Sequence, residues 1–230
     1  MSSAATPGPN FGETLSERSL TALVVVEAIE LFGIAPLSAE ARVPAWSLFV
    51  MIALNVAIVL AVVRGKTVAT IAVIFAALLE VFAVVLRVTS PSARTEALDF
   101  AAALTLLVAL TVVLAVTVFG PGRVTVHRVV GAVAIYLNVA VAFALAYRMI
   151  DSLGPGKFAM SPAGSGHILS TLVYFSFTTL TTTGYGDVVP IDAFARSLAN
   201  LESVIGQLFP ATLLARLVTL EIEHRRGEPR

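Results

Sequence analysis

Six long apolar segments constrain the fold of this chain more than any other feature of its sequence. They lie at residues 20–37, 43–63, 67–88, 97–119, 129–147 and 197–220. An α-helix needs about 20 apolar residues to cross roughly 30 Å of hydrocarbon. Backbone polar groups find no water inside a bilayer, and a helix satisfies them within one segment. The segments therefore predict an all-α membrane protein with six transmembrane helices.

The composition argues against several other classes of protein. Of the 230 residues, 57% are hydrophobic and 13% are charged, whereas soluble domains carry about 25% charged residues. The formal net charge is zero, which argues against nucleic acid as a partner, because such proteins carry a clustered basic face. Cysteine is absent and His127, His167 and His224 lie far apart, so no metal-ligand spacing appears. No nucleophile–base motif is present, and we expect neither an enzyme nor a cofactor.

The charged connections between the segments predict the orientation of the chain. Basic residues mark cytoplasmic loops, and those at 64, 66, 123, 128, 225 and 226 share one side of the membrane if the N-terminus is inside. The polar residues 1–19 lack the basic start and short apolar core of a signal peptide, so we expect a retained tail. Both tails, 1–19 and 221–230, are therefore predicted to be cytoplasmic.

The connection between the fifth and sixth segments, residues 148–196, differs from the others. It contains a stretch rich in Gly, Pro and Ser at 154–166 and a second apolar run at 167–180. This run has about 14 residues, too few to span the bilayer, which is typical of a re-entrant helix. The polar sequence TTTGYGD follows at 181–187. Non-helical backbone survives at membrane depth when it lines water, so we expect a water-filled path here.

Glycine at every second position indicates what this path would bind. Gly184 and Gly186 alternate with Thr183 and Tyr185, and glycine readily adopts a positive φ. Alternating left- and right-handed conformations can direct successive carbonyl oxygens to one side, where they replace the hydration shell of a cation. The carboxyl end of the 167–180 helix adds a partial negative charge. One alternative is an ordinary turn. Another is a phosphate-binding loop, but the sequence lacks the following lysine and the third glycine that such a loop needs.

The stretch TLTTTGYGD, residues 179–187, resembles the selectivity-filter signature of potassium channels, T-x-x-T-x-G-Y-G-D. The similarity extends over 129–220, about 40% of the chain. It implies a filter formed by Thr182, Thr183, Gly184, Tyr185 and Gly186. Carbonyl oxygens of the first four, with the Thr182 hydroxyl, would bind dehydrated K⁺, and Asp187 would lie at the outer mouth. The family surrounds the ion with four filter strands, so one signature per chain implies a homotetramer.

The resemblance also assigns roles to neighbours of the filter. Tyr185 would point away from the pore and form an aromatic collar with Tyr174 and Phe175 of the re-entrant helix. Thr178 occupies a position where some members carry a carboxylate, so the Glu–Asp pair of those members is not available. Thr183 stands where valine or isoleucine is usual, and its hydroxyl needs a partner behind the filter.

The sixth segment carries the expected gate. Gly206 lies twenty residues beyond Gly186, which matches the gating glycine of the resembled family. Pro210 removes a backbone donor and should kink the helix, so we assign this pair as a hinge. The alternative is close helix packing at Gly206. Gln207 and Thr212 are candidates for the wall of a wet cavity, or for bonds to a neighbouring helix.

The first four segments lack the charges of a voltage sensor. The fourth, 97–119, contains neither arginine nor lysine. One elementary charge moving through 100 mV gains about 2.3 kcal/mol, and steep gating needs several such charges per subunit. We therefore expect weak or no conventional voltage gating.

Three acidic residues lie well inside the first and third apolar segments. Glu27 and Glu30 share one face of the first segment, and Glu80 lies in the third. A charge at mid-bilayer costs about 2.5–3.5 kcal/mol on insertion scales, so these side chains should face other helices, with Asn55 and Arg87 as candidate partners. A polar network that holds the helices together is one interpretation, and coupling of proton binding to the gate is the other.

Together these observations favour a potassium-selective channel that conducts K⁺ passively as a homotetramer embedded in membrane lipid. We expect a cytoplasmic tail at 1–19, a four-helix domain without gating arginines at 20–119, a pore domain at 120–220 and a short tail at 221–230. The compact chain has no glycosylation sequon, which favours a bacterial plasma membrane. The alternatives are a weakly selective cation channel, because Thr183 alters the filter, and a non-conducting scaffold subunit.

Overall fold

The computed structural model describes residues 11–34, 46–62, 67–120, 126–154, 156–160 and 168–227. Its α-helices are α1 (Phe11–Ile29), α3 (Trp46–Val62), α4 (Thr67–Thr89), α5 (Ala93–Val118), α6 (Val126–Leu153), α8 (Ile168–Leu180) and α9 (Ala193–Gly227), and a short π-helix, η1 (Glu30–Ile34), continues α1. Two short strands, β1 (Phe158–Met160) and β2 (Val188–Pro190), form an antiparallel pair. The connections at 35–45, 63–66 and 121–125, with His167 and most of the predicted N-terminal tail, lie outside the described residues.

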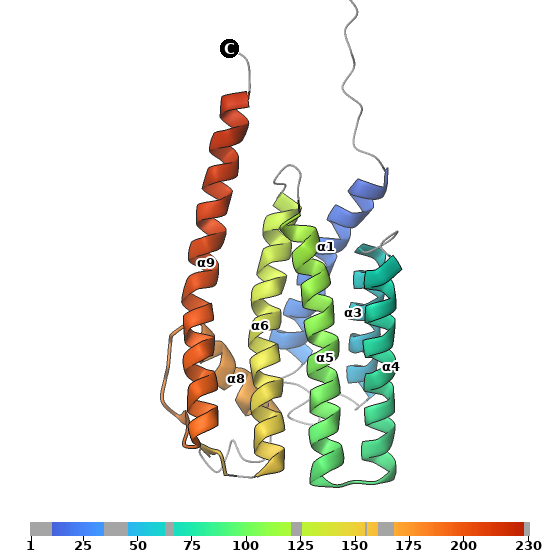
Figure 1. Ribbon diagram of the computed structural model, residues 1–230, viewed down its shortest axis with the longest axis vertical. Helices are drawn as coiled ribbons and strands as arrows, with labels where there is room; N and C mark the ends of the chain where they lie inside the picture. Colours follow the sequence, from blue (N-terminus) through green and yellow to red (C-terminus); the bar gives the residue numbers. More distant parts are fainter. Residues whose placement is uncertain are drawn as a thin grey trace, which may run out of the picture.

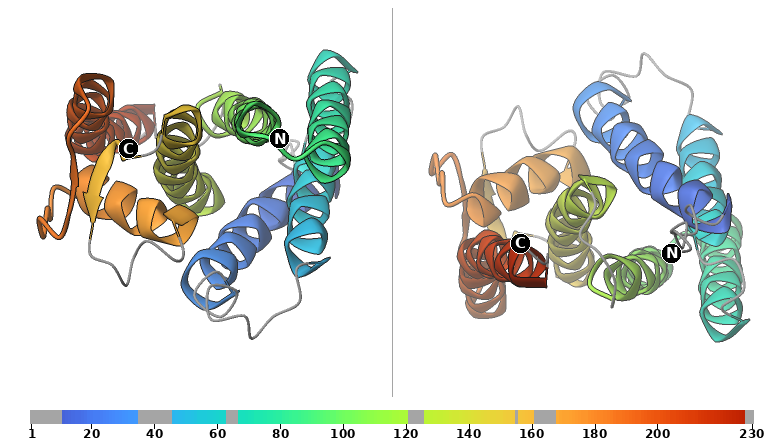
Figure 2. Two further views of the ribbon diagram at one scale, coloured as in Figure 1. Left: turned by 90° about the horizontal axis from the view of Figure 1, so that it is seen from below. Right: turned by 90° about the horizontal axis from the view of Figure 1, so that it is seen from above.

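The long helices run side by side along one axis (Figure 1). α5 lies between α4 and α6, and α6 lies between α5 and the pair formed by α8 and α9 (Figure 2). α8 is short and lies beside the lower part of α6 and α9 in Figure 1. The start of α1 and the end of α9 lie at the same end of the bundle. This arrangement is consistent with termini on one side of a membrane, and their cytoplasmic location stays a prediction.

Four of the described helices are long and apolar enough to span a membrane: α4, α5, α6 and the Ala193–Arg216 part of α9. α8 is apolar but has only 13 residues. The helices and their composition confirm the predicted all-α membrane protein. α1 and α3 adjoin residues outside the described ranges, so six spans with a re-entrant helix stay a prediction.

Two helices extend beyond the apolar segments that predicted them. α6 continues to Leu153, because its last turns still bury Tyr147 and Asp151. α9 begins at Ala193, four residues before the predicted start. Asp192 Oδ1 accepts the backbone N–H of Phe194 at 3.0 Å, and an acceptor at this position satisfies a donor that the first helical turn leaves free. Polar groups at the helix ends therefore lengthen both helices past their apolar parts.

Small side chains let α6 pack closely against its neighbours. Ala132, Ala140 and Ala144 of this helix have no exposed surface. A Cβ atom at Gly131 would lie 2.7 Å from Cγ2 of Val118 on α5, so a larger residue there would require Val118 to shift. Small residues are enriched between membrane helices because they let backbones approach. α6 contacts α1 and α5 on one side and α8 and α9 on the other, and it thereby joins the first helices to the TTTGYGD region.

Candidate functional site

The loop at 181–187 has a backbone of alternating handedness. The angle φ is +57° at Thr182, +55° at Gly184 and +79° at Gly186, whereas Thr183 and Tyr185 have negative φ. Such alternation turns successive carbonyl groups toward a common side, unlike an ordinary strand. A left-handed conformation costs a residue with a Cβ atom about 1–2 kcal/mol, so the contacts around Thr182 must hold it in place.

The carboxyl end of α8 holds the start of this loop. The Thr178 carbonyl oxygen accepts the backbone N–H groups of Thr183 at 2.8 Å and Gly184 at 3.1 Å. The Thr178 hydroxyl donates within the helix to the carbonyl of Phe175, at 2.9 Å. Thr178 therefore supports the loop through its backbone oxygen, a role that its side-chain type could not reveal.

The other end of the loop runs into β2. β2 pairs with β1 so that Phe158, Ala159 and Met160 lie opposite Pro190, Val189 and Val188, respectively. Arg196 Nε donates to the carbonyl of Pro190 at 2.9 Å. The connection rich in Gly and Pro thus supplies a strand that holds the C-terminal end of the loop. The sequence does not reveal this strand, because three residues are too few for a periodic pattern.

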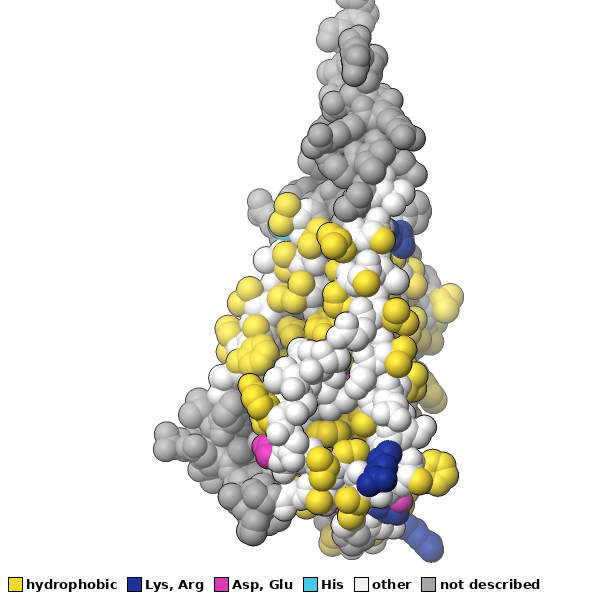
Figure 3. Space-filling model, turned by 90° about the vertical axis from the view of Figure 1, so that its left-hand side faces the viewer, with side chains coloured by type: hydrophobic (Ala, Val, Ile, Leu, Met, Phe, Trp, Pro, Cys, Tyr) yellow, Lys and Arg dark blue, Asp and Glu magenta, His cyan; other side chains and the backbone are white. Residues whose placement is uncertain are grey.

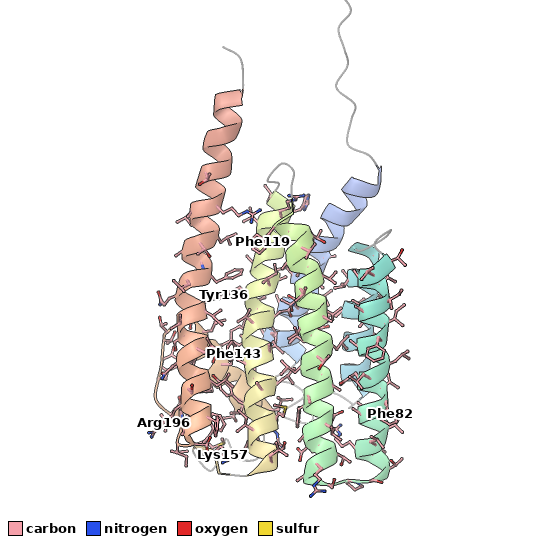
Figure 4. The ribbon with its side chains drawn as sticks, viewed as in Figure 1. Phe82, Phe119, Tyr136, Phe143, Lys157 and Arg196 are labelled. Carbon is pink, nitrogen blue, oxygen red and sulfur yellow. The ribbon has the colours of Figure 1, made fainter. Side chains whose placement is uncertain are left out.

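An ion pair reinforces the same end of the molecule. Lys157 Nζ lies 2.9 Å from Asp192 Oδ2, and Figure 4 shows Lys157 and Arg196 near the start of α9. The hydrogen bond from Lys157 lowers the pKa of Asp192, and the backbone N–H groups of Ala195 and Phe194 add to this effect. The loop at 181–187 is therefore held by α8 at one end and by β2 and this ion pair at the other.

The loop and the neighbouring face of α9 are uncovered in a single chain. Every residue from 181 to 187 is exposed, and 71% of the Tyr185 surface is accessible. Large apolar side chains of α9 are also exposed: Leu201, Val204, Leu208 and Leu214. Figure 3 views this side, where hydrophobic and uncharged polar groups cover the middle and charged side chains gather mostly near the lower end. A contiguous surface of this kind marks a protein or lipid contact.

The aromatic side chains around the loop divide into two groups. The rings of Tyr174 and Tyr185 stack with centroids 6.2 Å apart and an angle of 3°. Tyr174 Oη donates to Asp187 Oδ1 at 3.1 Å, a partner for this carboxylate that no local sequence pattern indicated. Phe175 is instead buried against Tyr147 and Phe158. The expected three-membered collar is therefore a Tyr174–Tyr185 pair, and Phe175 belongs to the core behind it.

A buried polar cluster lies behind α8. Glu202 of α9 has no exposed surface, and its Oε2 accepts the Tyr147 hydroxyl of α6 at 2.6 Å. Its Oε1 contacts the Ser176 hydroxyl of α8, which also donates to the Ala140 carbonyl at 2.6 Å. The Ser176 hydroxyl therefore lies between the Glu202 carboxyl and the Ala140 carbonyl. The cluster ties α6, α8 and α9 together.

Gly206 lies where α9 meets the end of α8. A Cβ atom at this position would lie 1.9 Å from the carbonyl oxygen of Leu180, and the Tyr136 hydroxyl donates to the same oxygen at 3.2 Å. α9 continues as a helix through Pro210, although proline cannot donate to the Gly206 carbonyl. The contact supports the close-packing alternative at Gly206, and the hinge assignment stays a prediction.

The two polar candidates for a cavity wall have different environments. Gln207 Nε2 donates to the Thr182 hydroxyl at 2.9 Å. The Thr212 hydroxyl donates within α9, to the carbonyls of Leu208 and Phe209. Both side chains are exposed in the single chain. The structure therefore brings Gln207, but not Thr212, to the TTTGYGD loop.

Contacts of an aromatic ring join the end of α5 to the middle and C-terminal half of α9. Arg216 donates to the Phe119 carbonyl and lies over the Phe119 ring, 5.2 Å from its centroid. Phe209 contacts the rings of Phe119 and Tyr136, and Figure 4 places both of these between α9 and the centre of the bundle. The position of Arg216 thus links α9 to the end of α5.

The intramembrane acids lie between helices. Glu27 and Glu80 are buried, and Asn55 Nδ2 of α3 donates to Glu30 Oε2 at 2.7 Å. Arg87 forms its ion pair with Asp99 of α5, at 2.9 Å. The structure thus brings Asn55 to an acid as expected, whereas the ion-pair partner of Arg87 is Asp99. These contacts agree with the interpretation of a network that holds the helices together.

The similarity to known proteins lies in the part of the chain that contains the TTTGYGD loop. The family model described as "Ion channel" matches residues 132–222, which include α8, the TTTGYGD loop and most of α6 and α9. Protein LctB of Bacillus caldotenax is 33% identical over 94 residues, covering 39% of this chain and 69% of the relative. Protein LctB of Geobacillus stearothermophilus is 34% identical over 87 residues, covering 36% of this chain and 64% of the relative. No solved structure matches.

Proposed function

This chain belongs to the ion channel family, and we propose that it conducts K⁺ passively across a membrane as a homotetramer, through a selectivity filter formed by residues 182–186. The observation that carries this proposal is the alternation of φ at Thr182, Gly184 and Gly186. A ladder of carbonyl oxygens replaces the water that a K⁺ ion sheds. Asp187 adds a negative charge at the outer end of the same loop.

The homotetramer follows from what one chain leaves open. A single loop contributes one side of a cation site, and a dehydrated ion needs oxygens around it. The exposed loop, with the exposed apolar side chains of α9 beside it, supports an interface in which four copies meet around the ion path. Closed rotational symmetry of this kind is usual for proteins with identical subunits.

Selectivity for K⁺ is favoured over a weakly selective pore by the environment of Thr183. The Thr183 hydroxyl lies 2.9 Å from the Thr181 hydroxyl, so it finds a partner within its own loop and leaves the backbone free for the ion. The Tyr174–Tyr185 stack supports the width of the loop from outside. Bi-ionic reversal potentials in lipid bilayers test this choice, and equal permeability to Na⁺ and K⁺ would support the weakly selective alternative.

Weak voltage gating follows from the charges of the first helices. Within the described part of α5 the only basic residue is Arg94, in the first helical turn, and Arg87 of α4 is paired with Asp99. We expect the open probability to change less than tenfold over a few tens of millivolts, because steep gating needs several mobile charges per subunit. A bacterial plasma membrane with both termini inside completes the proposal.

Potassium flux from liposomes tests conduction itself. Purified protein should release K⁺ from loaded vesicles, and the Tyr185→Ala variant, which loses the ring stack, should lower the preference for K⁺ over Na⁺. The assembly should have about four times the 24.1 kDa mass of one chain. A stable assembly with no flux of any monovalent cation would favour the non-conducting scaffold.

A further inference from the structure

One hydrogen bond connects α9 directly to the first residue of the proposed filter, between Gln207 Nε2 and Thr182 Oγ1 at 2.9 Å. We propose that Gln207 is a positioning residue for the innermost cation site, and that it fixes the Thr182 hydroxyl with its oxygen available to the permeant ion. This inference rests on the proposed function, because it concerns the ligands of that same site.

The hydrogen bonds of Thr182 define the direction of its hydroxyl. Thr182 Oγ1 donates its hydrogen to the Thr181 carbonyl at 2.7 Å. A hydroxyl has one hydrogen and two lone pairs. With the hydrogen committed to Thr181 and one lone pair accepting from Gln207, the remaining lone pair is free for a cation. A hydroxyl without the Gln207 contact can rotate, and a rotated hydrogen would repel the ion.

The backbone conformation of Thr182 also restricts the position of its hydroxyl. Its φ of +57° is rare for a β-branched residue, whose side chain already has few allowed rotamers. The hydroxyl is therefore held in one place by the backbone and two hydrogen bonds. One of these two hydrogen bonds is made to the neighbouring residue Thr181, and the other comes from Gln207 of α9.

The position of Gln207 is itself fixed by its neighbour. Gly206 lies against the Leu180 carbonyl so closely that a Cβ atom would not fit. Leu180 precedes Thr182 by two residues, and Gly206 precedes Gln207 by one. Two adjacent contacts, Gly206 with Leu180 and Gln207 with Thr182, therefore fix the position of α9 along its axis relative to the start of the loop. A movement of α9 at this level would change both contacts, and thus the orientation of the Thr182 hydroxyl.

Substitution of Gln207 tests the proposal. In Gln207→Met the length of the side chain is nearly kept and the donor is lost. Loss of one neutral hydrogen bond changes an equilibrium by about threefold to tenfold. We therefore expect a change of that size in the K⁺ concentration that gives half-maximal conductance, or in the Na⁺/K⁺ permeability ratio. Ser203→Ala is the matched control, because Ser203 lies one turn away on α9 and donates within its own helix, to the Ala199 carbonyl.

A double-mutant cycle separates positioning from simple helix packing. In the Thr182→Val background the hydroxyl is absent, so Gln207→Met should have no further effect on either quantity. The proposal is overturned if Gln207→Met behaves as wild type, if it acts equally with and without the Thr182 hydroxyl, or if both Gln207→Met and the smaller Gln207→Ala prevent assembly. Absence of K⁺ flux in the wild type refutes the proposed function instead, and the two failures are therefore distinguishable.

Discussion

Gly206→Ala separates the two roles considered for this glycine, a hinge and a close contact. The added Cβ atom would lie 1.9 Å from the Leu180 carbonyl oxygen, 2.7 Å from its carbon and 3.0 Å from its Cα atom. All three are backbone atoms, so no side-chain rotation relieves the clash. Real Cβ atoms do not come closer than 3.0 Å, and α9 and the end of α8 must therefore move apart by about 1 Å.

The size of the effect follows from this displacement. Overpacking of a close contact typically costs about 1–3 kcal/mol, and 1 kcal/mol shifts the melting temperature of a chain of this size by about 2–4 °C. We therefore expect the melting temperature of the detergent-solubilised assembly to fall by several degrees. The Tyr136 hydroxyl bond to the same carbonyl should weaken as well, and K⁺ flux should decrease because the proposed filter begins two residues later.

Gly33→Ala is the control for this experiment, since a Cβ atom there would meet no atom within 4 Å. If Gly206 acts only as a hinge, alanine should leave the assembly as stable or more stable, because alanine favours a helix by about 1 kcal/mol over glycine. An unchanged or raised melting temperature in Gly206→Ala would refute the packing argument. The measurement is differential scanning fluorimetry of both variants beside liposome flux.

Three further predictions follow from the described contacts. Gly184→Ala should lower selective K⁺ flux while the assembly persists, because a φ of +55° costs a residue with a Cβ atom about 1–2 kcal/mol although the space around it is open; full flux with wild-type selectivity would contradict this. Ser176→Ala should lower the stability of the assembly by about 1–3 kcal/mol, because it leaves the buried Glu202 carboxyl short of a partner, and an unchanged denaturation midpoint would refute it. The pKa of Asp192 is lowered from its ordinary value of 3.8, so its ion pair with Lys157 stabilises the protein above that pH and loses this effect as the pH falls through the lowered pKa. Melting curves of wild type and Asp192→Asn should therefore differ at neutral pH and converge in strong acid, and a constant difference would exclude this origin.

The unusual backbone of the TTTGYGD loop could be predicted from the sequence, because a backbone conformation with positive φ restricts which residues are found there. Positive φ at Gly184 and Gly186 favours residues without a Cβ atom, and glycine at every second position indicates that preference directly. Thr182 adopts the same left-handed conformation, although its residue type gives no indication of it. Its conformation is supported by local hydrogen bonds to the carbonyls of Thr179 and Thr181, and by one hydrogen bond from Gln207, which lies 25 residues away.

The directions of neighbouring side chains on a helix were harder to predict. Tyr174 faces the loop and Phe175 faces the core, although both are aromatic and adjacent. Successive residues of an α-helix point about 100° apart, so which one faces outward depends on the other helices. The partners of Glu202, Tyr147 and Ser176, also lie on two other helices. No local pattern identifies partners at such separations.

The length of α9 has a mechanical consequence. The helix continues from Pro210 to Gly227, a distance of about 25 Å at 1.5 Å per residue. A bend of about 10° at Pro210 would move its far end by about 4 Å, and would change the distance between diagonally opposite copies in a tetramer by roughly twice that. If α9 bends at Pro210, as the hinge prediction has it, the displacement would be largest at the end of the helix, and a pair of spin labels at Gly227 would detect bends too small to measure beside the loop.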